Sequence, residues 1–395
     1  MHALVGTIGV LLIVTVLWDV FETIVLPRRV TRRVRLTRLF YRTIWQPWSA
    51  AARTIHQGKR RETFLSIFGP LSLLVLLTLW ATTLVFGFAF IHWAINSRLG
   101  TPGDGSGFLL DFYFSGTTFF TLGLGDIAPV GALARTVTVI EASVGFGLLA
   151  LVIGYLPVLY QSFSRREVNI SMLDARAGTP PTACELLRRH QEAGSMSSID
   201  QLLRDWESWA ADLLESHLSY PVLCYFRSQH DNQSWLAALS TVLDACSLVM
   251  VGIDGMPKWQ AQLTFKMARH TIVDIAQIFN AAPGKDDGRL TSEGLAELRA
   301  ALANSGTALR NEPGDDATLA ELRAMYEPYT EVMSRYLMMP LPGWMPKARA
   351  ADNWQTSAFE NTSPAREQPF KKCIAGAATT DARVHRAAAS SDPRD

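Results

Sequence analysis

The sequence predicts an all-α membrane protein in which helices that cross the bilayer are followed by a soluble helical domain. Three apolar stretches are each long enough to span about 30 Å of hydrocarbon, which takes roughly 20 residues. The second half of the chain instead shows the amphipathic periodicity of helices in a soluble bundle. A third observation is the stretch T-L-G-L-G-D at residues 121–126, where two glycines interrupt the apolar first half.

Composition agrees with a chain that has one membrane part and one soluble part. Hydrophobic residues make up 48% of the sequence and charged residues 18%. Residues 1–161 contain 13 Lys and Arg against 7 Asp and Glu, whereas residues 162–395 contain 24 against 29. Neither part has the strongly basic balance of a nucleic-acid-binding protein. All four cysteines lie in the second part without C-x-x-C spacing, so we expect free thiols in a reducing compartment.

The three candidate spans are Ala3–Leu26, Phe64–Ile95 and Leu133–Tyr160. The first lacks a basic segment before it and a small-residue cleavage site after it, so we interpret it as a retained anchor rather than a signal peptide. It also lacks the arginine ladder of a voltage sensor. The segment 27–61 between the first two spans contains eleven Lys and Arg and no acid. The positive-inside rule therefore places this segment in the cytoplasm, the N-terminus outside and the C-terminus inside.

A shorter apolar stretch lies between the second and third spans. Residues 108–120 are too few to cross a bilayer and suit a re-entrant half-helix. The glycines that follow explain the interruption, because irregular backbone at membrane depth is tolerated where it is buried in protein or lines water. Glycine adopts left-handed backbone angles that leucine avoids. Alternation of the two therefore turns successive carbonyl oxygens of residues 121–125 to the same side, where they can replace the water around a cation.

The order Tyr113-Phe-Ser115, Thr118, Thr121-Leu-Gly-Leu-Gly-Asp126 and Pro129 resembles the pore loop of tetrameric potassium channels. The usual filter of that family is T-V-G-Y-G-D. Here Leu122 takes the valine position and Leu124 the tyrosine position, as in the G-L-G-D filters of two-pore-domain potassium channels. The resemblance extends without gaps from Tyr113 to Pro157, the pore loop plus the following helix.

The resemblance implies two transmembrane helices around a re-entrant pore helix and a selectivity filter; the first of the three predicted spans, Ala3–Leu26, is an addition to that family pattern. It implies potassium ions held by the filter, an acid at the outer mouth and a hinge in the inner helix. The chain would work as a homotetramer that conducts dehydrated K⁺ passively, without a cofactor. The filter residues are Thr121, Leu122, Gly123, Leu124 and Gly125, with K⁺ at the first four; the outer-mouth acid is Asp126, and the gating positions are Gly145 and Pro157. Two alternatives for Gly145 and Pro157 stay open, namely close helix packing and a simple helix end.

Three acids lie within predicted spans, where ionisable side chains face protein or water rather than lipid. We expect Glu141 to hydrogen-bond to the back of the pore helix near Thr117 or Thr118. For Asp19 and Glu22 we expect pairing with a basic group such as Arg28 or Arg29.

Five segments result from these observations. They are an extra N-terminal transmembrane helix at 1–26, a basic cytoplasmic loop at 27–61 that meets anionic lipids, a pore domain at 62–161, a helical cytoplasmic domain at 162–348 and a disordered tail at 349–395. The apolar stretch 234–251 is predicted to be a buried helix of the soluble bundle. The sequence contains no nucleophile elbow, P-loop, metal-ligand spacing or G-x-G-x-x-G, so we predict that the protein is not an enzyme.

The leading hypothesis is a potassium-selective channel in the cell membrane. Because Leu124 lacks the hydroxyl with which tyrosine supports the filter of the family, a non-selective monovalent cation channel is the first alternative. A membrane-anchored sensor or scaffold with a vestigial pore is the second. The sequence does not indicate which stimulus or regulator acts on the cytoplasmic domain.

Overall fold

The computed structural model describes nine ranges of the chain: residues 2–26, 35–96, 98–100, 107–192, 198–230, 232–253, 255–284, 288–346 and 352–355. The chain forms two compact units. The first consists of Met1–Arg165 with Leu214–Arg227, and the second of Arg166–Leu213 with Ser228–Asp395.

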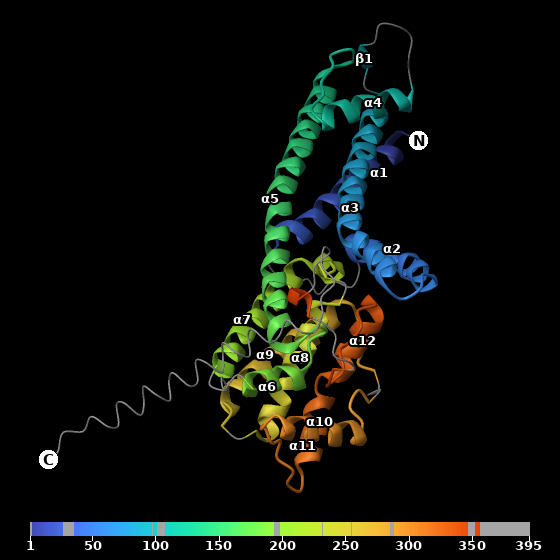
Figure 1. Ribbon diagram of the computed structural model, residues 1–395. Helices are drawn as coiled ribbons and strands as arrows, with labels where there is room; N and C mark the ends of the chain where they lie inside the picture. The colour runs from blue at the N-terminus through green and yellow to red at the C-terminus, as the bar shows by residue number, and fades with distance from the viewer. Residues whose placement is uncertain are drawn as a thin grey trace, which may run out of the picture. The chain divides into compact units, whose positions relative to one another are not determined.

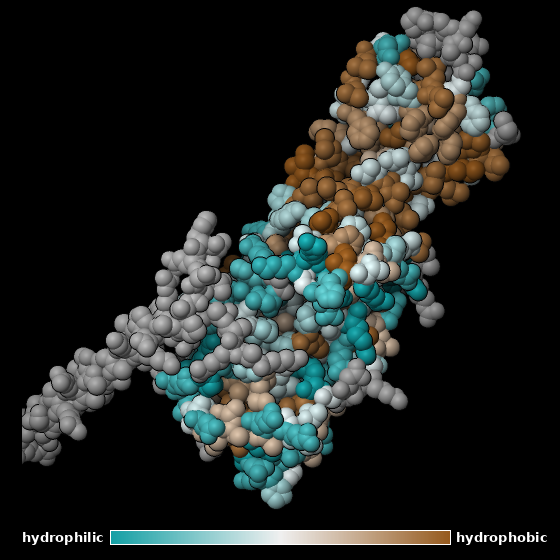
Figure 2. All heavy atoms as spheres, turned by 45° about the vertical axis from the view of Figure 1, so that its right-hand side comes forward, coloured by the Kyte–Doolittle hydropathy of each residue, from teal (hydrophilic) through white to brown (hydrophobic). Residues whose placement is uncertain are grey.

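The first unit is built from long apolar helices and a short crosswise helix (Figure 1). Its elements are α1 (His2–Val20), η1 (Phe21–Val25), α2 (Leu36–Thr54), α3 (Lys59–Ala94), β1 (Arg98–Gly100), α4 (Phe108–Phe119), β2 (Ala128–Val130), α5 (Ala132–Ala177) as far as Arg165, and η2 (Pro221–Tyr225). Hydrophobic side chains cover much of the face over α1, α3 and α4 in Figure 2, as expected for helices that meet lipid.

Helix α1 packs closely along α3. The two backbones approach at a pair of glycines: a Cβ on Gly9 would lie 2.5 Å from the carbonyl oxygen of Gly87, and one on Gly87 would lie 2.7 Å from Ile13. Small residues allow such close approach between membrane helices, where packing drives association. The extra first helix is therefore an integral partner of α3.

The segment 27–61 differs from the basic loop that we expected. Residues 27–34 lie outside the described residues, but Leu36–Thr54 form the helix α2. This helix has an apolar face, on which Phe40, Tyr41 and Trp45 are buried, while Arg42 and Arg53 are exposed. The sequence prediction missed the helix because the abundance of arginines obscured an amphipathic pattern.

Helix α4 lies crosswise at one end of α3 and α5 (Figure 1) and begins and ends close to the predicted half-helix. The antiparallel strands β1 and β2 pair Arg98 with Val130 and Gly100 with Ala128. They therefore join the residues before α4 to those after the loop 120–127. Helix α5 continues to Ala177, well past the predicted end near Tyr160, and Pro157 lies inside it.

The second unit is a helical bundle around α8 (Trp235–Gly252). Its other elements are α6 (Ala183–Glu192), α7 (Ser198–Ser219) as far as Leu213, α9 (Lys258–Ile278), α10 (Ser292–Asn304), α11 (Asp315–Ala324), α12 (Glu327–Leu337) and η3 (Asn353–Gln355). The side chain of Ser234 accepts a hydrogen bond from the Ala237 amide at 3.0 Å and caps α8. Helices α6, α9, α11 and α12 all pack against α8.

Four described helical segments are long and apolar enough to cross a membrane, namely His2–Val25, α3, α5 and α8. They differ in how much protein already covers them. In the most apolar window of α8, 94% of residues are buried, against 22–39% in the other three segments. Because other helices of its unit surround α8, its apolarity is that of a core helix, as the sequence suggested.

An ionic network is buried beside α8. Asp244 is fully buried, accepts a hydrogen bond from Tyr326 Oη at 2.6 Å and pairs with Arg289. Arg323 pairs with the fully buried Glu327 at 2.9 Å. Desolvation raises the pKa of Asp244 to about 6, although Arg289 and Tyr326 oppose that shift. Charges removed from water in this way stabilise a fold only while their partners are in place.

Part of the predicted disordered tail is ordered. Asp352 forms a bidentate pair with Arg189, at 2.7 and 3.2 Å, and the amide of Trp354 donates to Asp174 at 3.4 Å. Residues 347–351 and 356–395 lie outside the described residues. Cys184, Cys224 and Cys246 are buried free thiols, as expected from their spacing.

Candidate functional site: the loop after α4

The backbone of the glycine-rich loop alternates in handedness. Gly123 has φ +51° and Gly125 has φ +78°, whereas Leu122 and Leu124 have no positive φ. This alternation is the one predicted from the sequence. Thr121 also has a positive φ, +58°, which is uncommon for a residue other than glycine and was not anticipated.

The loop is attached to α4 at its base and near its far end. The amides of Leu122 and Gly123 both donate to the carbonyl oxygen of Thr117, at 2.8 and 3.3 Å. Tyr113 Oη donates to the Asp126 carboxylate at 3.0 Å. Asp126, the predicted outer-mouth acid, therefore also holds the end of the loop to α4 through this hydrogen bond. The Tyr113 hydroxyl supplies a donor that Leu124 cannot.

The side chains of the loop project away from the chain's own core. Leu122 and Leu124 are each 63% exposed, and Phe120 is 59% exposed. Several exposed apolar side chains close together are typical of a surface that another molecule covers.

Behind α4 lies a fully buried polar cluster that joins three helices. Glu141 of α5 accepts a hydrogen bond from Ser115 of α4, and its carboxylate lies 3.2 Å from His92 Nε2 of α3. Ser115 also bonds to the carbonyl oxygen of Val85, at 2.9 Å. All three polar side chains are 0% exposed. A carboxylate in such a position is held by its partners, because a lone buried charge is costly.

Glu141 was predicted to bond to the back of the pore helix, and it does so, although its partner on that helix is not the expected residue. The contact is to Ser115, one helical turn before the expected Thr118, and Thr117 instead bonds to the carbonyl of Phe114 at 2.9 Å. The contacts of Ser115 and His92 were not predicted from the sequence. An ionisable residue inside an apolar span is a signal that could have identified His92.

Gly145 lies where α5 passes the C-terminal end of α4. A Cβ there would lie 2.1 Å from the carbonyl oxygen of Phe119, which real side chains do not tolerate. Gly147, two residues later, has nothing within 4 Å of its Cβ position. The geometry therefore gives Gly145 a packing function, which was the alternative to a hinge in the sequence analysis.

We expect Gly145→Ala to destabilise the protein by about 1–3 kcal/mol, because the added methyl group forces α4 and α5 apart. Gly147→Ala is the matched control and should be neutral or stabilising by up to about 1 kcal/mol, since alanine favours helix. Thermal unfolding in lipid nanodiscs measures both. Equal tolerance of the two substitutions would show that this close contact is absent.

At the other end of α3, the segment Leu214–Arg227 packs into the first unit although the chain before and after it belongs to the second. The Tyr225 ring contacts Tyr41, Trp45 and Phe68 at centroid distances of 5.7, 5.0 and 5.0 Å. Phe226 occupies the space that a Cβ on Gly69 would need, 2.7 Å away. Arg227 lies 3.5 Å from Glu62. We call residues 220–227 the aromatic wedge.

The aromatic wedge also contacts α5 near Pro157. Tyr220 packs against Tyr155 at 5.4 Å, and Phe226 packs against Tyr160 at 6.0 Å and Phe163 at 5.6 Å. Pro157 is therefore not a helix end, and the helix around it is held by the aromatic wedge. This contact was not predicted from the sequence, because it joins residues about 65 positions apart.

Of the two acids near the end of the first helix, Glu22 pairs with a basic group, as expected, and that group is Arg35, while Asp19 is held by neutral donors. Asp19 accepts hydrogen bonds from Trp80 Nε1 at 3.0 Å and from the Thr37 hydroxyl at 2.5 Å. Glu22 accepts from Trp18 at 2.8 Å and lies 3.6 Å from Arg35. Arg28 and Arg29 lie outside the described residues. Both acids thus tie the first helix to its neighbours.

Two comparisons with known proteins bear on this site. Residues 74–161, which contain most of α3, the whole of α4, the glycine-rich loop and α5 as far as Gln161, match a family model described as "Ion channel". The match identifies an ion-channel pore domain at these residues and confirms the resemblance to pore-loop channels.

The chain is also 28% identical over 251 residues to the "Uncharacterized membrane protein YdjJ" of Bacillus subtilis (strain 168). That alignment covers 59% of this chain and 71% of the relative, so the similarity extends beyond the pore domain. No solved structure matches. The family match and the apolar helices together support a membrane protein with a channel domain.

Proposed function

We propose that the chain is one subunit of a homotetrameric potassium-selective channel of the cell membrane. In this proposal K⁺ passes along the axis between four copies of the loop 121–125. The observation that supports it best is the alternating backbone of Gly123 and Gly125 at the end of a half-helix. Such a backbone directs carbonyl oxygens of Thr121, Leu122, Gly123 and Leu124 toward one axis, where they replace the hydration shell of the ion.

The exposed leucines of the loop support the assembly. A single subunit would leave Leu122 and Leu124 in contact with water, at a cost of about 25 cal/mol per Å² of apolar surface. Neighbouring subunits would cover them. One loop supplies only a quarter of the oxygens that a closed ring needs, so the proposed pore depends on self-association.

The proposed topology has three spans, formed by His2–Val25, α3 and α5. The basic segment 27–61, with α2, then lies on the cytoplasmic side beside anionic lipids. The second unit would also be cytoplasmic. Pro157 would be the place where α5 changes during gating, with the aromatic wedge holding the helix there, whereas Gly145 would keep α5 packed closely against α4.

A non-selective monovalent cation channel on the same scaffold is the second candidate. Leu124 favours it, because leucine provides no hydroxyl to brace the filter. Against it stands the bond of Tyr113 to Asp126, which braces the loop from α4. The alternative of a scaffold with a vestigial pore predicts no ion flux at all.

Flux from liposomes that contain the purified protein separates the three candidates. The proposal expects K⁺ flux well above Na⁺ flux, and Gly123→Asp should abolish both. Equal K⁺ and Na⁺ flux would favour the non-selective channel, and no flux would favour the scaffold. In a host deficient in potassium uptake, the wild-type chain should restore growth at low potassium and the Gly123→Asp variant should not.

A further inference from the structure

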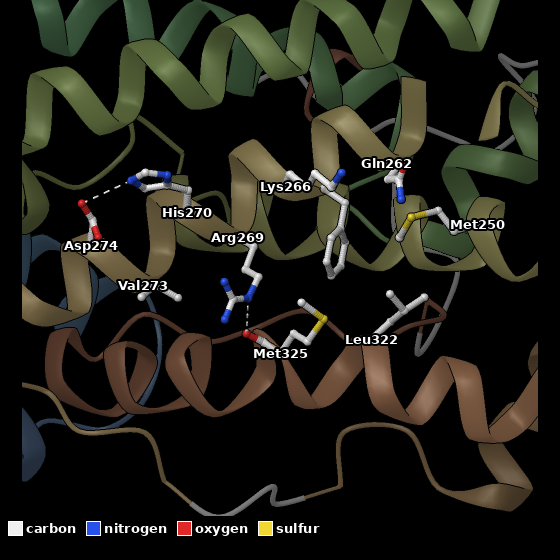
Figure 3. Close-up of a pocket in the computed structure, with 10 residues that line it drawn as sticks. Met250, Gln262, Lys266, Arg269, His270, Val273, Asp274, Leu322 and Met325 are labelled. Carbon is white, nitrogen blue, oxygen red and sulfur yellow. Dashed lines mark hydrogen bonds and ion pairs between the residues drawn. The ribbon is translucent and has the colours of Figure 1, made fainter. Parts of the chain in front are cut away.

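The second unit has a cavity of about 510 Å³ between α9 and α11 that the proposed pore does not use. Figure 3 shows Arg269 of α9 extending toward Met325, with Leu322 close to Met325 on the facing helix. The volume is within the range of small-molecule sites in proteins, about 300–1,000 Å³. Its lining combines two cations with an apolar wall.

The cations are Lys266 and Arg269, three residues apart and therefore on one face of α9. Arg269 Nε donates to the carbonyl oxygen of Met325 at 3.1 Å, a bond that extends the guanidinium along the cavity. Lys266 has no hydrogen bond or ion pair to any residue in the described part of the chain. The nearby His270 is 3.4 Å from Asp274, so the acid at this end of the cavity already has a partner.

The apolar wall has a rigid part and an adaptable part. Phe265 is only 3% exposed and packs edge-on against Tyr326 at 5.8 Å. Tyr326 is in turn held by its hydrogen bond to Asp244, so the position of Phe265 depends on the buried ionic network. Met250 and Met325 line the cavity, and Met325 is 41% exposed. Methionine side chains adapt to irregular apolar partners.

We propose that this cavity binds an organic anion with an apolar body, of the class of a medium-chain carboxylate. The carboxylate would lie between Lys266 and Arg269, and the apolar body would cover Phe265, Leu322 and Met325. Charge complementarity favours an anion, because Lys266 and Arg269 supply two positive charges to the cavity. The carboxylate in the described lining, that of Asp274, lies 3.4 Å from His270. Small hydrated anions such as phosphate should bind more weakly, because they cannot cover the apolar wall and exclude water from it.

Calorimetric titration of the full-length protein in nanodiscs with decanoate tests the proposal, with empty nanodiscs as the baseline for partition into lipid. Saturable binding of decanoate is expected, with decanol and inorganic phosphate each at least about tenfold weaker. Lys266→Gln with Arg269→Gln should weaken decanoate binding by at least about tenfold. Lys258→Gln, on the same helix but outside the cavity lining, should leave it unchanged.

A charge reversal separates loss of the site from loss of the fold. Lys266→Glu with Arg269→Glu should bind decylammonium more tightly than decanoate, a preference that an unfolded unit would not acquire. Decanoate binding that survives both double substitutions, or decanol binding as strong as that of decanoate, would overturn the proposal. These titrations measure no ion flux, so their outcome is independent of whether the pore conducts potassium.

Discussion

Replacing Glu141 by alanine is expected to destabilise the first unit by roughly 2–4 kcal/mol. The buried ring of His92 loses its hydrogen-bond partner, at about 1–3 kcal/mol, and a buried methylene is lost, at about 0.8 kcal/mol. His92 on α3 is 0% exposed, whereas Ser115 on α4 keeps a second acceptor, the carbonyl oxygen of Val85 at 2.9 Å. The pore helix would therefore lose the polar contact that joins it to α5, while its bond to α3 remains.

Two variants on the same helix separate this contact from general damage. Glu141→Gln keeps an oxygen that can accept from Ser115 and should cost less than the alanine substitution. Ser143→Ala removes an exposed hydroxyl that, among the described residues, bonds to the carbonyl oxygen of Val139 on its own helix at 2.7 Å, and should be close to neutral. Thermal unfolding in nanodiscs gives the ranking. An alanine variant as stable as Ser143→Ala would show that the cluster does not hold α4.

The same variants also test the proposed filter. If α4 positions the loop 121–125 through Thr117, then displacement of α4 should lower the ratio of K⁺ to Na⁺ permeability. A Glu141→Ala protein that still folds and keeps the wild-type ratio would contradict that link, while leaving the stability prediction intact.

Replacing Tyr225 by alanine is expected to cost about 3–5 kcal/mol, the usual range for removing a large buried aromatic side chain. Tyr225 is 3% exposed and its ring contacts three aromatic side chains, one of them on α3 and two on α2. The segment that carries it is connected at both ends to chain of the second unit. Loss of the ring therefore weakens the hydrophobic cluster and also loosens the attachment of the segment Leu214–Arg227 to the first unit.

This effect should leave ion selectivity unchanged. Phe68, which contacts Tyr225, and Val85, which contacts α4, are separated on α3 by about 25 Å at 1.5 Å per residue. We therefore expect a lower unfolding midpoint and an altered K⁺ flux at an unchanged K⁺ to Na⁺ ratio. Tyr225→Phe keeps the ring and should restore both the midpoint and the flux. Unchanged flux in a destabilised Tyr225→Ala protein would restrict the aromatic wedge to a structural role.

The helices of the first unit were predictable because membrane spans leave a strong local signal. Lipid requires about 20 apolar residues in succession, and the predicted stretches Ala3–Leu26 and Phe64–Ile95 match α1 with η1 and α3 to within a few residues. Helix α5 continues past the predicted span Leu133–Tyr160 to Ala177, and hydropathy did not show this continuation because the sequence after Tyr160 is no longer a continuous apolar run. The helix α2 was missed for a related reason, because its apolar residues occupy one face of an amphipathic helix and do not form a continuous apolar run.

The particular pairs of residues that meet between distant parts of the chain could not be predicted. His92, Ser115 and Glu141 come from three helices, and no spacing in the sequence indicates that they meet. The same is true of Tyr225 with Tyr41 and Trp45. In each case the cost of leaving a polar or large aromatic side chain unpartnered decides the pairing, and that cost is set by packing in three dimensions.

The sequence by itself determined the apolar helices, the half-helix and the alternating loop, because each depends on hydrophobicity or on the backbone freedom of glycine within a few neighbouring residues. The tertiary structure decided that Glu141 bonds to Ser115, that Gly145 must lack a side chain, and that α8 is covered by protein. These features depend on which surfaces face each other when the helices pack, and neighbouring residues in the chain carry no information about that.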